Sequence, residues 1–205
     1  MEDFLSICLG LGLAAAAGFR LFVPALLIGL GIRFGPEGLS SLESFPAWVG
    51  STPALIALGA ATSFEVGAYY FPWLDNVLDT IMSPLAVLAG ILLFAGATTE
   101  MPPMWRWSLA ILAGGTAAGL TQSATVIART ASSVGTGGLA NFILATVELI
   151  ASIVFSAVAA ILAPTIPILL ALGLAFVIYQ RERAPAHGST GADAARGTGN
   201  DMRTE

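Results

Sequence analysis

Long apolar stretches, interrupted by glycine, proline and a few charges, occupy most of this chain. The first stretch, residues 4–32, is longer than one membrane span, and Gly18-Phe19-Arg20 and Pro24 interrupt it. We therefore expect a bent or discontinuous helix there. Further apolar runs cover residues 53–71, 77–98, 108–128, 139–162 and 165–180. Because about 20 apolar residues cross a bilayer as a helix, the pattern predicts an all-α, polytopic membrane helix bundle with about six spans.

Polar segments separate these runs. Residues 33–52 predict an exposed loop, with room for a short interfacial helix, and residues 129–138 predict a Ser/Gly-rich loop. Residues 100–107 form a connector whose tryptophans are typical of the headgroup boundary. After residue 183 the composition changes to small polar residues with scattered charge, which cannot bury enough apolar area to fold. We expect a membrane domain at residues 1–183 and a disordered polar tail at residues 184–205.

Two parts of the sequence resemble each other. The matched segments are Ala14–Gly18 with Gly115–Gly119, Ala61–Glu65 with Leu144–Glu148, and Ser83–Gly90 with Ile166–Gly173. Repeat 1 covers about residues 4–98 and repeat 2 about residues 105–180. Three spans per half is an odd number, so the pattern predicts a 3+3 inverted repeat with a broken first helix in each half, as in membrane transporters. A re-entrant hairpin in either first block would change this parity.

The composition agrees with a membrane protein. Of 205 residues, 56% are hydrophobic and 10% charged, against about 25% charged in soluble domains. The mean hydropathy is +0.85. The net charge of -5 gives no reason to expect a nucleic-acid partner.

Few residues offer covalent or metal chemistry. Cys8 is the only cysteine, which excludes an intramolecular disulfide and a thiolate cluster, and the only histidine, His187, lies in the tail. We expect no metal, no cofactor and no intramembrane enzyme. The first residues, Met1–Asp3, are acidic where a secretory signal is basic, so we expect a retained first span.

Glu65 and Glu148 are the first candidates for a functional site. Each lies inside an apolar run, where a carboxylate costs about 2.5–3.5 kcal/mol on insertion scales. The repeat places both near one pseudo-twofold axis, so they could face a common cavity and relay a proton or cation. A purely structural role, with each acid bonded to a neighbouring helix, is the alternative.

Arg20 is the next candidate. It stands at the break of the first block, and Thr121 stands at the matching break of the second. A guanidinium beside a broken helix could bind a phosphate or a carboxylate, or pair with Glu65. The alternative is a side chain that snorkels to the interface. We expect a partner inside the protein.

Several further polar residues complete the candidate site. Asp75 and Asp79 lie one helical turn apart and share a face, so they could hold a hard cation; a solvated helix entrance gives the same pattern. Thr121, Gln122 and Asn141 lie in or beside the second broken segment. They could line a pathway, or form hydrogen bonds between helices.

Some of these residues belong to a recognisable pattern. Its parts are Gly18-Phe19-Arg20-Leu21-Phe22-Val23-Pro24, Pro46-Ala47-Trp48, Glu65, and Pro72-Trp73-Leu74-Asp75-Asn76-Val77-Leu78-Asp79. Over about residues 5–180 the chain resembles the bacterial membrane family known as domain of unknown function 4126. The resemblance implies no activity; it implies a membrane topology and points to Arg20, Glu65, Asp75 and Asp79.

The distribution of arginines indicates an orientation. With six spans, Arg129, Arg181 and Arg183 fall on one side and Arg33 and Arg106 on the other. This distribution favours both termini in the cytoplasm of a multi-pass protein of the bacterial inner membrane.

Two functions agree with these features. The first is a small inverted-repeat transporter or channel-like permease for an ion, a small solute or a lipid headgroup, with the lipid bilayer as its surroundings. Glycine- and alanine-rich faces favour a homodimer. The second is a non-transporting membrane scaffold or assembly protein, whose polar residues only stabilise packing.

Overall fold

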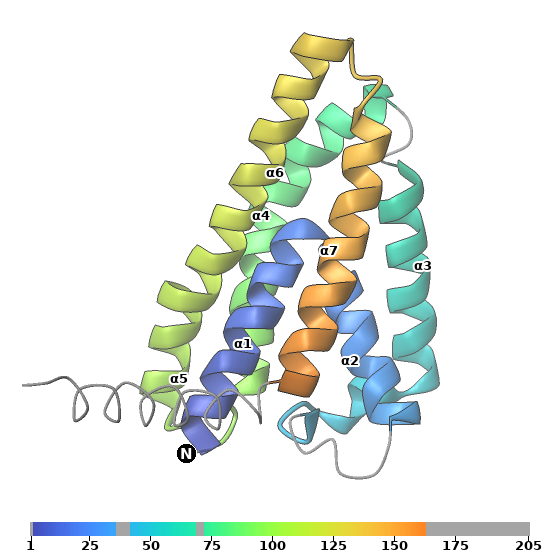
Figure 1. Ribbon diagram of the computed structural model, residues 1–205. Helices are drawn as coiled ribbons and strands as arrows, with labels where there is room; N and C mark the ends of the chain where they lie inside the picture. The colour runs from blue at the N-terminus through green and yellow to red at the C-terminus, as the bar shows by residue number, and fades with distance from the viewer. Residues whose placement is uncertain (1, 36–41, 69–71, 163–205) are drawn as a thin grey trace, which may run out of the picture. The chain divides into compact units, whose positions relative to one another are not determined.

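The computed structural model describes residues 2–35, 42–68 and 72–162, which belong to one compact unit, Met1–Pro167 (Figure 1). In this part every regular element is helical, which confirms the all-α prediction. The elements are α1 (Glu2–Phe19), α2 (Val23–Phe34), η2 (Ala47–Gly50), α3 (Thr52–Ala68), α4 (Pro72–Ala97), α5 (Pro103–Leu109), η3 (Ala110–Gly114), α6 (Gly115–Thr136) and α7 (Asn141–Leu162). The predicted last span at residues 165–180 and the tail at residues 184–205 lie outside the described residues.

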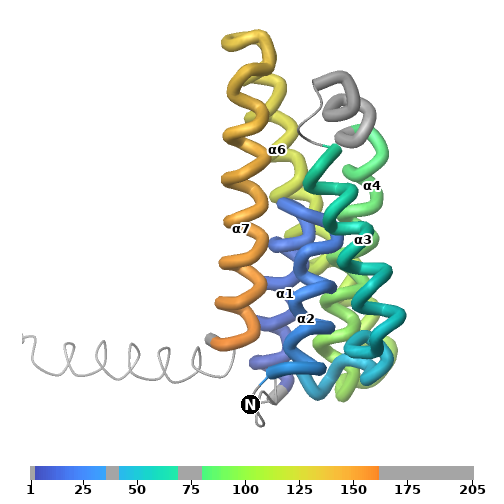
Figure 2. The backbone as a smooth tube through the Cα atoms, turned by 90° about the vertical axis from the view of Figure 1, so that its right-hand side faces the viewer, coloured from blue at the N-terminus to red at the C-terminus, as the bar shows by residue number. Residues whose placement is uncertain are grey.

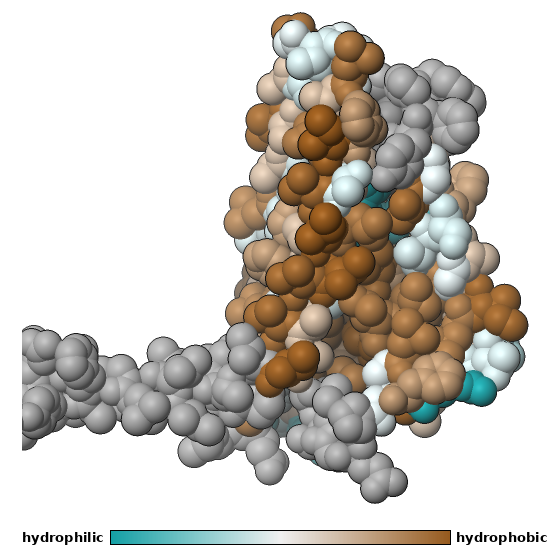
Figure 3. Space-filling view, turned by 45° about the vertical axis from the view of Figure 1, so that its right-hand side comes forward, coloured by the Kyte–Doolittle hydropathy of each residue, from teal (hydrophilic) through white to brown (hydrophobic). Residues whose placement is uncertain are grey.

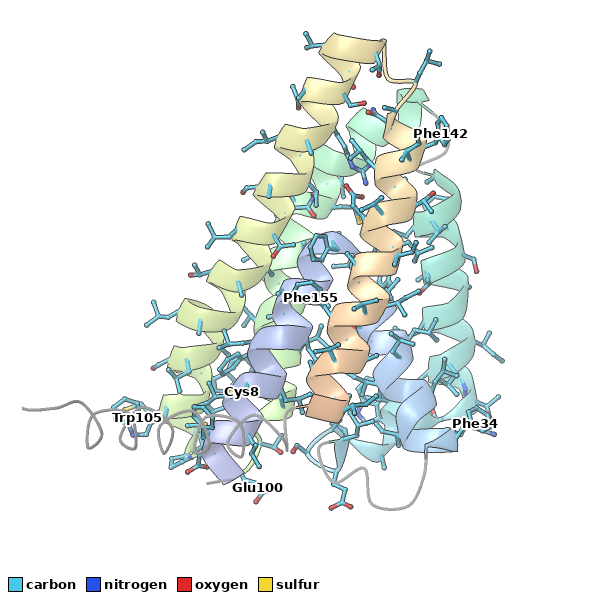
Figure 4. The ribbon with its side chains drawn as sticks, in the orientation of Figure 1. Cys8, Phe34, Glu100, Trp105, Phe142 and Phe155 are labelled. Atoms are coloured by element: carbon cyan, nitrogen blue, oxygen red, sulfur yellow. The ribbon has the colours of Figure 1, made fainter. Side chains whose placement is uncertain are left out.

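The first apolar block folds as a helical hairpin. α1 ends at Phe19 and α2 begins at Val23, so the predicted break is confirmed. Pro24 lies in the first turn of α2, where a missing N–H costs no helical hydrogen bond. The N-terminus, marked in Figure 1, and Phe34, labelled in Figure 4 in the same orientation, both lie at the lower end of the bundle, which we call the N-terminal end. The hairpin turns back beside the middle of α7 and returns toward the N-terminal end (Figure 1).

The second block contains no such break. α5, a π-helical segment at η3, and α6 form one helical segment, Pro103–Thr136. The prediction of a broken first helix in each half is therefore wrong for the second half. The reason is local: the positions that match Arg20 and Pro24 hold Thr121 and Thr125, which continue a helix.

The predicted loop at residues 129–138 is also mostly helical, because α6 continues to Thr136. Its two threonines donate to carbonyls of their own helix, Thr130 Oγ1 to the Val126 oxygen and Thr136 Oγ1 to the Ser132 oxygen, each at 2.8 Å. Serine and threonine at this position therefore satisfy their polar groups inside the helix and do not interrupt it. The helix ends before Gly137, whose φ of 64° is the left-handed conformation that glycine adopts at helix ends.

The 3+3 inverted repeat is not supported by the described helices. α1 and α6 carry matched sequences and both run away from the N-terminal end, whereas α3 and α7, which carry the matched glutamates, run in opposite directions (Figure 1). The hairpin explains why α1 and α6 run in the same direction while α3 and α7 run in opposite directions. It returns the chain to its starting side in the first half, while the second half crosses the bundle in one continuous segment.

The hairpin lies at the centre of the bundle. Figure 2 shows it between α6 and α7 on one side and α3 and α4 on the other, and α1 packs against α4, α6 and α7. Gly18 permits the close approach of α1 to α6, because a Cβ there would lie 2.5 Å from the Ala118 carbonyl oxygen. The ring of Phe19 packs against that of Phe155 in α7, with centroids 5.5 Å apart.

The outer surface of the bundle is apolar, and its buried faces are partly polar. In α7 the inward side carries Glu148, Ser152 and Ser156, whereas Ile150 and Val154 are exposed. Figure 3 shows hydrophobic residues over most of the face that includes α7. This arrangement is the reverse of a soluble helix and agrees with lipid contact.

Three helical segments are long and apolar enough to cross a membrane, Thr80–Ala97, Pro103–Thr136 and Asn141–Ile161. The two hairpin helices are apolar but shorter. These features are consistent with the predicted membrane protein, whereas the predicted number of six spans is not established by the described residues.

Candidate binding site at the hairpin tip

Glu65 of α3 binds the tip of the hairpin. Its Oε1 accepts a hydrogen bond from the Leu21 N–H at 2.7 Å, and its Oε2 accepts one from the Phe22 N–H at 3.2 Å. Leu21 and Phe22 directly precede α2, with Phe22 as its N-cap, so the carboxylate lies at the helix end that carries a partial positive charge. Glu65 is 2% exposed and thus lies inside the bundle.

Arg20 joins the same tip to α7. It follows the last residue of α1, where a cation is favoured by the partial negative charge of the helix end. Its Nη2 donates to the Ala145 carbonyl at 2.7 Å and lies 3.3 Å from Oε2 of Glu148. Ser152 adds a second connection, because its hydroxyl donates to the Ala16 carbonyl at 2.9 Å. Arg20 is 1% exposed, so the expectation of an internal partner is correct and snorkelling is excluded.

Arg129 of α6 is the second partner of Glu148. Its Nε donates to Oε1 of Glu148 at 2.9 Å, and its Nη2 pairs with Oε2. Arg129 was not among the predicted site residues, because its segment resembled a loop. The overlooked signal is periodicity: Gln122, Thr125 and Arg129 follow one face of a helix, and all three are buried.

The four buried residues Arg20, Glu65, Arg129 and Glu148 form what we call the hairpin-tip cluster. Glu65 interacts electrostatically with both Arg20 and Glu148, so the two predicted acids do lie close together. Arg20 also forms an ion pair with Glu148. The cluster contains two guanidinium groups, which stay charged, and two carboxyl groups, whose charge a proton can remove. An anion or a cation that binds there would compete with these internal partners.

The three predicted pathway residues lie at different places. Gln122 is buried and its Nε2 donates to the Ser83 hydroxyl of α4 at 3.4 Å. Asn141 is buried at the start of α7, and its Nδ2 donates to the Ser133 hydroxyl at 3.1 Å. Thr121 donates to a carbonyl of its own helix at 3.0 Å. These contacts agree with hydrogen bonding within and between helices, and none of them defines a pathway.

The remaining predicted pair, Asp75 and Asp79, falls in the first part of α4. Their side chains lie outside the described residues. Among the side chains that are described, no group of acidic, cysteine or histidine residues has the arrangement of a metal site.

The fold and the cluster define a class: an all-helical bundle with candidate membrane spans and a buried ionic cluster at the tip of a helical hairpin. A family model described as "Domain of unknown function (DUF4126)" matches residues 7–181, and the chain belongs to that family. A comparison with curated proteins found no match. A comparison with solved structures found none either.

Proposed function

We propose that this protein is a small membrane transporter or permease whose substrate or ion site is the hairpin-tip cluster. The observation that carries the proposal is the meeting of two helix ends with four buried charges at mid-height of the bundle. Transporters place broken helices at such a depth because helix ends supply partial charges for binding. Irregular backbone at membrane depth is tolerated only when protein or a cavity surrounds it.

The contacts suggest how such a site would operate. Glu65 connects α3 to the tip through two N–H groups, and Glu148 connects α7 to it through Arg20. Loss of either negative charge, through a proton or a competing ligand, would weaken one of these connections. The two glutamates are therefore the proton or cation ligands of the proposal, and Arg20 is the counter-ion or anion contact.

The orientation is part of the same proposal. Phe34 and Trp105 lie at the N-terminal end (Figure 4), and so do their sequence neighbours, Arg33 and Arg106, whereas the six-span prediction puts these two arginines on the side opposite the N-terminus. They are the arginines outside the hairpin-tip cluster among the described residues. Arg129 is buried and carries no weight as a loop charge. The positive-inside rule then favours an N-terminus in the cytoplasm of a multi-pass protein of the bacterial inner membrane.

Accessibility of the cluster tests the proposal. Single cysteines replace Gln122 or Ser152 in a Cys8→Ser background, and a water-soluble thiol reagent is applied to proteoliposomes. Both positions are buried in the described state, so labelling requires a state that admits water. Ile127 and Ile150, which are exposed on the outer face, serve as controls that should resist the reagent in lipid. Protection of both test positions from both sides, with full labelling after denaturation, would overturn the proposal.

Flux provides the second measurement, with protons as the probe and a trapped pH-sensitive dye as the reporter. Wild-type proteoliposomes should exceed protein-free vesicles, and Glu65→Gln and Glu148→Gln should each lower the rate at least tenfold. Glu100→Gln is the matched control, because Glu100 is exposed at the N-terminal end. Equal flux in wild type and both cluster variants would contradict the assigned roles.

A scaffold is the second candidate, and one observation favours it. Each glutamate of the cluster already has internal partners, two N–H groups for Glu65 and two guanidinium groups for Glu148. A scaffold predicts inaccessible cysteines at Gln122 and Ser152, no flux, and a loss of stability in the same variants.

A further inference from the structure

An apolar cavity of about 770 Å³ separates parts of the bundle that otherwise pack closely. Residues of α2, η2, α3, α4 and α5 line it, among them Ala25, Val49, Leu58 and Leu92. Its volume lies in the range of small-molecule sites, which is about 300–1,000 Å³. α3 packs mainly against α2 and η2 and has little contact with α4, so the space between α3 and α4 is not closed by helix packing.

One end of the cavity is basic. Arg106 and Thr99 are the charged and hydroxyl-bearing side chains among its described lining residues. The Arg106 Nε donates to the Ala95 carbonyl at 2.8 Å, and its guanidinium lies 5.5 Å from the ring centroid of Trp107. Among the described residues, neither Nη of Arg106 has a hydrogen-bond acceptor. A guanidinium that is oriented by one bond and keeps its outer N–H groups suits an anionic oxygen pair.

The cavity connects two depths of the bundle. Arg106 adjoins Trp105, which lies at the N-terminal end (Figure 4), where tryptophans mark the headgroup level. Leu21 and Phe22 line the cavity too, and they belong to the hairpin tip near mid-height. An occupant thus meets a cation at the interface and only apolar side chains further inside.

The geometry points to a phospholipid-binding site: the phosphate lies at Arg106 beside Thr99 and Trp107, and one acyl chain fills the cavity toward the hairpin tip. The combination of an interfacial cation with an apolar interior selects an amphiphile and disfavours a purely polar solute. The basic group is an arginine, whose planar fork pairs with two phosphate oxygens. This inference does not depend on transport by the hairpin-tip cluster.

Native mass spectrometry of the purified, delipidated full-length protein tests the site, with phosphatidylglycerol as the probe. Wild type should retain one lipid per chain, and Arg106→Gln should weaken retention at least tenfold. Arg33→Gln is the matched control, because Arg33 donates to the Gly50 carbonyl and the Thr52 hydroxyl and does not line the cavity. Equal retention by the Arg106 and Arg33 variants would overturn the inference.

The apolar part of the site needs a separate variant. Ala89→Phe places a ring in the cavity lining and leaves Arg106 in place, so it should displace the acyl chain and lower retention at least tenfold even if the Arg106 variant misfolds. Ala60→Phe adds the same ring at an exposed position of α3 outside the cavity lining and should bind like wild type. Retention by Ala89→Phe at the wild-type level would contradict the assignment. Preferential retention of palmitate over phosphatidylglycerol would overturn the phospholipid assignment and identify a free fatty acid as the ligand. None of these measurements uses flux, so their failure is distinguishable from failure of the transport proposal.

Discussion

The replacement of Glu148 by glutamine tests the physical basis of the hairpin-tip cluster. Glu148 is 5% exposed and interacts with two arginines, each bound through a carboxylate oxygen. Glutamine has the same shape, but it has no negative charge and presents an amide NH₂ where an oxygen faced a guanidinium. The variant therefore removes the carboxylate that Arg20 and Arg129 share while leaving the packing volume unchanged.

The expected loss is large. Removing one member of a buried ion pair typically costs about 3–5 kcal/mol, mainly because the other charge stays buried. For a chain of this length, about 1 kcal/mol corresponds to about 2–4 °C in melting temperature. Glu148→Gln should therefore lower the melting temperature by roughly 6–20 °C.

The assay is thermal unfolding of the purified protein in one detergent, followed by circular dichroism or by intrinsic fluorescence. Glu100→Gln, at an exposed position, should change the free energy of unfolding by less than about 0.5 kcal/mol. The double variant Arg129→Gln/Glu148→Gln should be more stable than Glu148→Gln alone, because it also removes one of the buried positive charges. A melting temperature of Glu148→Gln within about 2 °C of wild type would refute the reasoning, because the pair would then contribute no more than a surface contact.

Two further predictions concern the hairpin. Gly18→Ala should lower the melting temperature, because the new Cβ would lie 2.5 Å from a backbone carbonyl oxygen of α6. Gly59→Ala is the control and should be neutral or stabilising, because nothing lies within 4 Å of its Cβ. Equal effects of the two substitutions on the melting temperature would contradict the argument that Gly18 permits close packing. Glu65→Gln should accelerate hydrogen exchange of the N–H groups of Leu21 and Phe22 about tenfold, because hydrogen bonds to a charged acceptor are stronger than those to a neutral one. Exchange-coupled mass spectrometry of the peptide that contains the tip measures this, and unchanged exchange would mean that Glu65 does not hold the tip.

Much of the fold was predictable from apolar runs and helix breakers. The runs at residues 53–71, 77–98 and 139–162 agree closely with α3, α4 and α7. The break near Arg20 was predictable because a charge and Pro24 lie together there. The direction of the chain after the break was not predictable, because it depends on the lengths of the two helices, α1 and α2, that the first apolar block forms. α2 has 12 residues, too few for a full crossing, and its packing against α3 and α7 fixes its course.

The candidate site was predictable in part. An isolated charge in an apolar run is conspicuous, so Arg20, Glu65 and Glu148 were identified. Arg129 was not, because it lies in a polar-looking segment in which serine, threonine and glycine usually indicate a loop. In an apolar environment the hydroxyl groups of such residues donate to carbonyls of their own helix. Their presence therefore no longer indicates a loop.

The two matched glutamates are bound in different ways, and the difference follows from the two helices that face them. A broken helix has N–H groups without helical partners at its restart, and these groups donate the hydrogen bonds that Glu65 accepts, with Arg20 adding an electrostatic attraction. An unbroken helix has none to offer, because each N–H already bonds to the carbonyl four residues earlier. In the second half, where α6 is continuous, the carboxylate of Glu148 therefore needs a guanidinium, and Arg129 supplies it from α6 itself. The break in one half and the additional arginine in the other are thus two solutions to one requirement, the binding of a carboxylate inside an apolar bundle.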